Sequence, residues 1–123
     1  MPLVRNTDAP VFTLPGLTIR GLASPKRGCR ETCVWRLALD PGAPGVPHAV
    51  TREEVFVATS GNAVAVLDGA RHELAPGDTL IVPAGTEFAL ANPNGRPFEA
   101  VVTLPVGGQA RTAEGTFTPP WAE

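Results

Sequence analysis

Short stretches of alternating apolar and polar residues, separated by turn residues, recur along the whole chain. In residues 32–39 (TCVWRLAL), every second residue from Cys33 through Trp35 to Leu39 is apolar. Because successive side chains of a strand point to opposite faces, this pattern predicts a strand with one buried face. Comparable stretches predict about ten short strands, among them residues 11–14, 17–23, 32–39, 54–59, 62–67, 71–74, 79–82, 87–91 and 98–104.

Turn residues are frequent enough to exclude long helices. The 123 residues include 13 Gly and 14 Pro, so few windows of helical length lack a breaker. Asp68-Gly69, between two apolar runs, is typical of a tight β-hairpin. We therefore expect an all-β sandwich or barrel in which hairpins close most edges.

Charge and hydropathy limit the partners. Lys and Arg number 10 against 12 Asp and Glu, and the basic residues are scattered, so we expect no nucleic-acid partner. The chain shows no apolar run of membrane-spanning length and no signal-peptide pattern, so we expect no membrane association and a cytoplasmic location. Cys29 and Cys33 are expected to be reduced thiols, with Cys33 partly buried.

Two ordered sets of glycine, proline and polar residues occupy the middle of the chain. The first is Gly42, five residues, His48-Ala49-Val50, three residues, Glu54, six residues and Gly61. The second is Gly77, five residues, Pro83-Ala84-Gly85, two residues, Phe88, three residues and Asn92. We expect the glycines to form sharp turns with positive φ, Pro83 to fix a tight turn, and Asn92 to bond backbone groups at a strand end.

This arrangement resembles the two sequence motifs of the cupin family. The resemblance implies an all-β double-stranded β-helix, or jelly roll, with a pocket between its two sheets. We expect one cupin domain over residues 1–123, with the motifs in 42–92, N-terminal strands in 11–23 and a C-terminal tail in 105–123. The resemblance also implies a homodimer, with the strands at 11–14 and 17–23 as candidates for exchange between subunits.

The chain departs from the family at the positions that usually bind one divalent metal ion. These positions are His48, Val50, Glu54 and Phe88, and two of them are hydrocarbon side chains that cannot ligate a metal. We therefore predict no metal cofactor. The alternative is a divalent metal ion held by His48 and Glu54, with waters or His72 completing the ligands; His72 can equally be a surface residue of a hairpin.

His48 and Glu54 have two interpretations, which the sequence leaves open. They are either a hydrogen-bonded pair that persists because each satisfies the other, or a catalytic acid–base pair in which Glu54 orients or charges His48. Val50 and Phe88 either fill the former metal cavity or form the wall of an apolar ligand pocket. The proposed ligand-binding residues are Val50, Phe56, Phe88, Leu90, Trp35 and, if it points inward to receive a carboxylate, Arg52.

These residues support three functions. The first is a small cupin that binds a small organic molecule in an apolar pocket and acts as an isomerase, epimerase or cyclase through His48 and Glu54. The second is a metal-dependent, dioxygenase-like cupin with a reduced ligand set. The third is a non-catalytic sensing or scaffold barrel. In the C-terminal tail, Trp121 is expected to dock on the barrel or on a second subunit.

Overall fold

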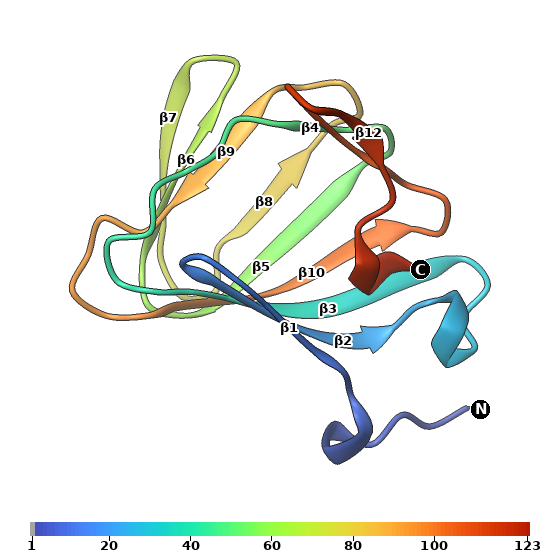
Figure 1. The fold of residues 1–123 in the computed structure, drawn as a ribbon. Coiled ribbons are helices and arrows are strands. Elements are labelled where there is room, and N and C mark those ends of the chain that lie inside the picture. Colours follow the sequence, from blue (N-terminus) through green and yellow to red (C-terminus); the bar gives the residue numbers. More distant parts are fainter. Residues whose placement is uncertain (1) are drawn as a thin grey trace.

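The polypeptide forms two facing layers of antiparallel strands in a computed structural model that describes residues 2–123 (Figure 1). In chain order, the strands are β1 (Val11–Leu14), β2 (Leu17–Ala23), β3 (Thr32–Leu39), β4 (Ala49–Val50), β5 (Glu54–Ser60), β6 (Ala63–Leu67), β7 (Ala70–Leu74), β8 (Thr79–Val82), β9 (Phe88–Ala91), β10 (Phe98–Pro105), β11 (Ala110–Thr112) and β12 (Gly115–Phe117). Three short 3-10 helices, η1 (Asn6–Asp8), η2 (Pro25–Arg27) and η3 (Pro120–Ala122), complete the described elements. The all-β prediction is confirmed.

One layer is a six-stranded sheet in the order β1-β2-β3-β10-β5-β8. The opposite layer consists of two three-stranded sheets, β12-β11-β4 and β7-β6-β9. An isolated antiparallel bridge between His48 and Phe88 joins these two small sheets. Figure 1 shows the large sheet as one wall, with the small sheets facing it and the C-terminal segment between the two layers at one end.

The alternating pattern explains where the core lies. Along β3 every second side chain, from Cys33 through Trp35 to Leu39, is buried, and the intervening side chains are partly or fully exposed. β10 repeats this alternation from Phe98 to Leu104, and it pairs with both β3 and β5. Each large apolar side chain buried in this way stabilises the fold by about 1.5–3 kcal/mol. The inward faces of these three central strands therefore hold the two layers together.

Most predicted strands agree with the structure within one residue. No strand was predicted at β4, which has two residues, or at β11 and β12, which lie in the predicted C-terminal tail. β11 pairs with β4 on one side and β12 on the other, so its partner is some 60 positions distant along the chain (Ala110 with Val50). Such short strands carry too little pattern of their own to be recognised without their partners.

The turn residues of the two motifs behave as predicted. Gly42, Gly61, Gly77 and Gly85 all have positive φ. Gly61 is the most constrained, because a Cβ added there would lie 2.1 Å from the carbonyl oxygen of Pro97. Asn92 is fully buried; its Nδ2 donates to the carbonyl oxygens of Leu39 (3.2 Å) and Arg96 (2.7 Å), and its Oδ1 accepts from the Asn94 N–H (3.0 Å).

Two further expectations concern cysteines and membranes. Cys29 and Cys33 are both free thiols, and Cys33 is fully buried rather than partly. Burial, together with the neighbouring Cys29, raises the pKa of the Cys33 thiol to about 11.

No helix within residues 2–123 has the length and apolar character needed to cross a bilayer.

Candidate functional site

A cavity of about 210 Å³ lies between the two layers of the barrel. Its wall includes residues of both layers, the turn between β1 and β2, the loop before β4 and the C-terminal segment. Within residues 2–123, His48 and Glu54 are the only titratable side chains of this wall, and the remaining side chains are apolar. The cavity is therefore an apolar chamber with two groups that can exchange protons.

His48 is held in one orientation at this wall. Its backbone forms two hydrogen bonds with Phe88, from the His48 N–H to the Phe88 oxygen (3.0 Å) and in return (2.8 Å). Its Nδ1 lies 2.9 Å from the carbonyl oxygen of Val46. Because a carbonyl can only accept, Nδ1 carries the hydrogen in this contact, so the neutral ring has its lone pair on Nε2. The fixed imidazole can thus act as a proton acceptor through Nε2.

Glu54 is the first residue of β5, and its pairing with Val82 of β8 turns its side chain inward. The residue is 5% exposed. Among the described residues, neither a side-chain hydrogen bond nor an ion pair engages its carboxyl. Burial alone raises the pKa of this carboxyl from 4.5 to about 8, so at neutral pH the group is mainly the uncharged acid. In that form its O–H is a hydrogen-bond donor.

His48 and Glu54 line the same cavity but do not form the mutually satisfied pair that one interpretation required. The hydrogen bonds and ion pairs among residues 2–123 include none between them. The reason is that Nδ1 of His48 is hydrogen-bonded to the Val46 carbonyl oxygen in its own loop, while Glu54 projects from the opposite sheet. Neither side chain is therefore occupied by the other, and both residues line the cavity.

The structure brings together the apolar residues that the sequence proposed for ligand binding. Trp35, Val50, Phe56, Phe88 and Leu90 all line the cavity. They come from β3, β4, β5 and β9. Their position on the wall agrees with the expected pocket, and ligand binding by them stays a prediction.

Two polar side chains proposed for the site do not reach the cavity. Arg52, considered as a carboxylate receptor, is exposed in the bend before β5. His72, considered as a supplementary metal ligand, is exposed on β7, an edge strand of the opposite layer. Arg52 lies two residues before Glu54, but the bend between them breaks the strand alternation on which its inward direction depended.

The donor set does not fit a metal ion of the kind the resemblance implied. Val50 and Phe88, both on the cavity wall, cannot ligate, and one imidazole and one carboxyl fall short of the usual three protein ligands. Across residues 2–123, no group of three or more His, Cys, Asp or Glu side chains is arranged to hold a metal ion.

Sequence reasoning missed one aromatic wall residue, Trp121 in η3. Its ring lies 6.0 Å from that of Phe12 and 6.3 Å from that of Trp35, measured between centroids. It also lines the cavity, together with Pro119. We expected Trp121 to dock on the barrel or on a second subunit, and it docks on the barrel of its own chain. The position of Trp121 after two prolines indicated that its side chain packs against something, but it did not indicate which surface.

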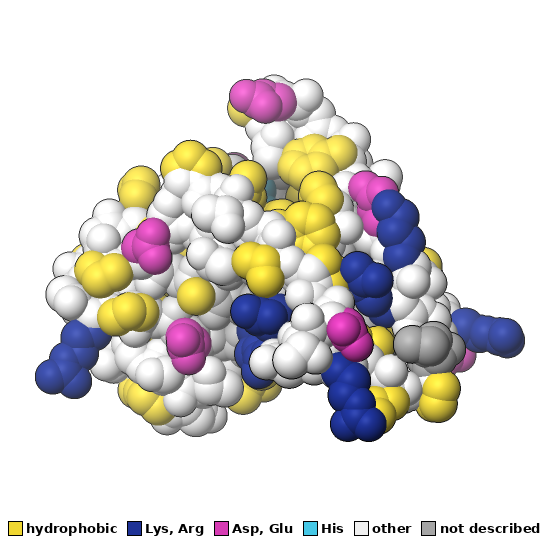
Figure 2. All heavy atoms as spheres, turned by 60° about the horizontal axis from the view of Figure 1, so that its bottom comes forward, with side chains coloured by type: hydrophobic (Ala, Val, Ile, Leu, Met, Phe, Trp, Pro, Cys, Tyr) yellow, Lys and Arg dark blue, Asp and Glu magenta, His cyan; other side chains and the backbone are white. Residues whose placement is uncertain are grey.

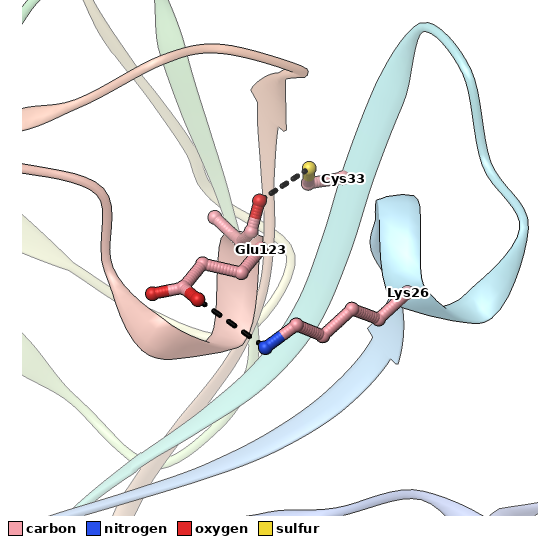
Figure 3. A network of polar contacts seen from close by, with 4 residues as sticks. Lys26, Cys33 and Glu123 are labelled. Atoms are coloured by element: carbon pink, nitrogen blue, oxygen red, sulfur yellow. Dashed lines mark hydrogen bonds and ion pairs between the residues drawn. The ribbon is translucent and has the colours of Figure 1, made fainter.

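The segment that carries Trp121 is attached by few polar contacts (Figure 3). Lys26 Nζ lies 3.3 Å from Glu123 Oε2, and the Lys26 N–H donates to the Glu123 carbonyl oxygen over 3.2 Å. The Cys33 Sγ lies 3.7 Å from the Ala122 carbonyl oxygen. The ion pair is exposed, so its contribution is about 1 kcal/mol or less. Packing of Trp121 is thus the main attachment of this wall.

Comparison with known proteins gives the family context. Residues 35–104 match the family model described as the cupin domain. No curated protein is significantly similar to the chain in sequence.

Several solved structures share the fold. The polyketide cyclase RemF from Streptomyces resistomycificus has a TM-score of 0.76 at 21% identity, covering 85% of this chain and 79% of that one. An RmlC-like cupin from Shewanella frigidimarina has a TM-score of 0.74 at 20% identity, covering 85% and 90%. A sugar phosphate isomerase of the cupin superfamily from Silicibacter pomeroyi has a TM-score of 0.63 at 23% identity, covering 84% and 75%. These similarities confirm the jelly-roll barrel.

Proposed function

The chain belongs to the cupin family, and from that premise we propose that its barrel binds a small organic molecule and moves a proton on it. His48 is the proton acceptor and the neutral Glu54 carboxyl is the proton donor. The reaction class is an isomerisation, epimerisation or cyclisation, in which a proton leaves one atom and another is delivered without net oxidation.

The observation that carries this proposal is the pairing of opposite proton roles in one apolar cavity. The Nδ1 contact to Val46 leaves Nε2 of His48 as an acceptor, while burial keeps Glu54 protonated at neutral pH. An efficient acid or base has a pKa near the working pH, which is the range that burial gives Glu54. With two groups of opposite roles, one can accept a proton from the ligand while the other delivers a proton to it.

The apolar wall supports the binding half of the proposal. Phe88 stacks near the His48 ring, with centroids 4.3 Å apart, and Phe56 meets Phe88 at 5.8 Å. A largely apolar lining with a few polar groups is typical of small-molecule sites. The names of two similar structures, a polyketide cyclase and a sugar phosphate isomerase, are compatible with this reaction class, although similarity at 21% and 23% identity extends to the fold alone.

The test uses an uncharged ketone, indanone, as a probe. Hydrogen–deuterium exchange at the carbon next to its carbonyl, followed by NMR in heavy water, measures proton transfer directly. Chemical-shift changes of the Val50 and Phe88 amides measure binding in the same sample. We expect the protein to accelerate exchange, and His48→Gln or Glu54→Gln to reduce the acceleration by about a hundredfold.

The chain supplies matched controls for both variants. His72→Gln and Glu53→Gln remove the same side-chain types at exposed positions and should leave the rate unchanged. Binding without accelerated exchange would replace the catalytic proposal with a non-catalytic barrel. If neither indanone nor other uncharged ring compounds of similar size shift the cavity amides, the binding proposal is wrong as well.

A further inference from the structure

We propose that the ligand of this cavity is an uncharged, planar ring compound with an oxygen that accepts hydrogen bonds, and that Trp121 is the wall residue that selects for its planarity. This inference rests on the proposed function, because it names the substrate class of the same cavity. It is carried by three features of the wall within residues 2–123: its aromatic content, its lack of Lys and Arg, and its unpaired carboxyl donor.

The aromatic residues of the chain are concentrated at the cavity. The sequence has five Phe, two Trp and no Tyr. Four of these seven, namely Trp35, Phe56, Phe88 and Trp121, line the cavity, and the His48 ring lies beside them. Neighbouring rings are steeply inclined, by 63° for Trp35 and Trp121 and by 67° for Phe56 and Phe88. Such a wall offers both ring faces and ring edges, which are the surfaces that favour another aromatic ring.

The charge distribution disfavours an anionic ligand. No Lys or Arg within residues 2–123 lines the cavity, and the nearest sequence candidate, Arg52, is exposed. In the view of Figure 2, the Lys and Arg side chains stand on the outer surface. A carboxylate or phosphate inside would lose its hydration next to hydrocarbon and the Glu54 carboxyl, without a cation to compensate. An uncharged ligand avoids this cost.

One hydrogen-bond donor of the wall, the neutral Glu54 carboxyl, lacks a side-chain partner within residues 2–123. The Trp121 Nε1–H also lacks a partner among these residues, but it is too buried to face the cavity, so Trp121 offers a ligand its ring and not its donor. Leaving a buried donor unpaired costs stability. A ligand oxygen, such as that of a ketone or phenol, can accept a hydrogen bond from Glu54 and offset part of this cost.

Trp121 differs from the other aromatic wall residues in its origin. Trp35, Phe56 and Phe88 are on strands of the barrel, whereas Trp121 is on η3, the last turn of the chain. Its contacts with Phe12 and Trp35 position a large flat side chain at the wall. Replacing it changes the shape of the cavity without removing a strand residue. It is therefore the aromatic wall residue whose role can be tested without altering a barrel strand.

The experiment compares four probes with the same number of carbon atoms by NMR titration of the cavity amides. Indanone is planar and has a ketone oxygen, indene is planar without oxygen, cyclononanone is a puckered ketone, and cinnamate is planar but anionic. We expect indanone to bind about tenfold more tightly than each of the other three. Trp121→Ala should remove the preference over cyclononanone, and Trp121→Phe should retain much of it.

The control variant is Phe117→Ala, which removes an exposed aromatic residue of the same tail that does not line this cavity. It should leave all four affinities unchanged. If cyclononanone or cinnamate binds as tightly as indanone, the substrate class is wrong while the proposed function stands. If no probe binds, both fail. If Trp121→Ala weakens all probes equally, Trp121 is a structural residue and not the selective one.

Discussion

His48 and Phe88 contact each other through both backbone and side chain. Two reciprocal backbone hydrogen bonds of 3.0 and 2.8 Å connect them, and their ring centroids are 4.3 Å apart. By the motif positions, these are two of the four places where the resembled family binds metal. The backbone pairing of these two motif positions is thus present, while a phenyl ring stands at one of them and Val50 stands at a third. The cavity wall includes all four motif positions but carries only two side chains with atoms that can ligate a metal.

Restoring the missing donors should therefore create a metal site. In the double variant Val50→His with Phe88→His, three imidazoles and Glu54 face one cavity. We expect it to bind one equivalent of Zn²⁺ or Ni²⁺ about a hundredfold more tightly than the unmodified chain, because it reaches the usual ligand number. Isothermal titration calorimetry measures this, with Val57→His and Val66→His, both exposed, as the matched control. Equal affinity of the two double variants would contradict convergence of the four positions.

Glu54 should make the folded state less stable as the pH rises. The unfolded chain releases this proton near pH 4.5, whereas the folded chain keeps it until about pH 8. Between these values the unfolded state binds fewer protons, so the free energy of unfolding falls with increasing pH, by more than about 2 kcal/mol in total. Urea denaturation across this range should show a weaker decline for Glu54→Gln. Glu53→Gln, which changes an exposed carboxyl, should keep the full decline; identical profiles for all three proteins would contradict the buried acid.

The C-terminal segment should depend on packing and not on its ion pair. Lys26→Ala removes an exposed ion pair and should change the free energy of unfolding by less than about 1 kcal/mol. Trp121→Ala removes contacts with Phe12 and Trp35 and should cost about 2–4 kcal/mol. Thermal and urea denaturation of the two variants give the comparison. A larger loss for Lys26→Ala would show that the ion pair is the main attachment.

Gly61 should be far less tolerant of substitution than other glycines with positive φ. In Gly61→Ala the new Cβ meets the Pro97 carbonyl oxygen at 2.1 Å, so the backbone must move, and we expect a loss of about 3 kcal/mol or more. Gly77→Ala has a φ of +92° but an open surrounding, so it should lose only about 1–2 kcal/mol. Denaturation of both variants tests this. Equal losses in the free energy of unfolding would mean that the positive φ, and not the close approach of the Pro97 oxygen, limits substitution at Gly61.

Most of the strands, the turns and the inward faces of the barrel could be predicted from the sequence alone. Alternation places Trp35 and its neighbours inside, and the spacing of the glycines and Asn92 matches turns that the structure contains. It could do so because these signals are local: they depend on a period of two residues and on backbone angles that glycine adopts easily. Three of the apolar cavity residues, Trp35, Phe56 and Leu90, followed from the same alternation, whereas Val50 and Phe88 followed from their positions in the motifs of the resembled family.

Tertiary structure decided which groups meet. Whether His48 bonds Glu54 depends on where each side chain ends, and only the assembled loop shows that Nδ1 is engaged by Val46. The direction of Arg52 depended on a bend that interrupts the strand period, and the pairing of β11 with β4 depends on residues far apart in sequence. Trp121 likewise joins the cavity wall through contacts with residues that are far from it in the sequence. Contacts between distant segments, and the burial that raises the pKa of Glu54, exist only when the whole chain has folded around one cavity.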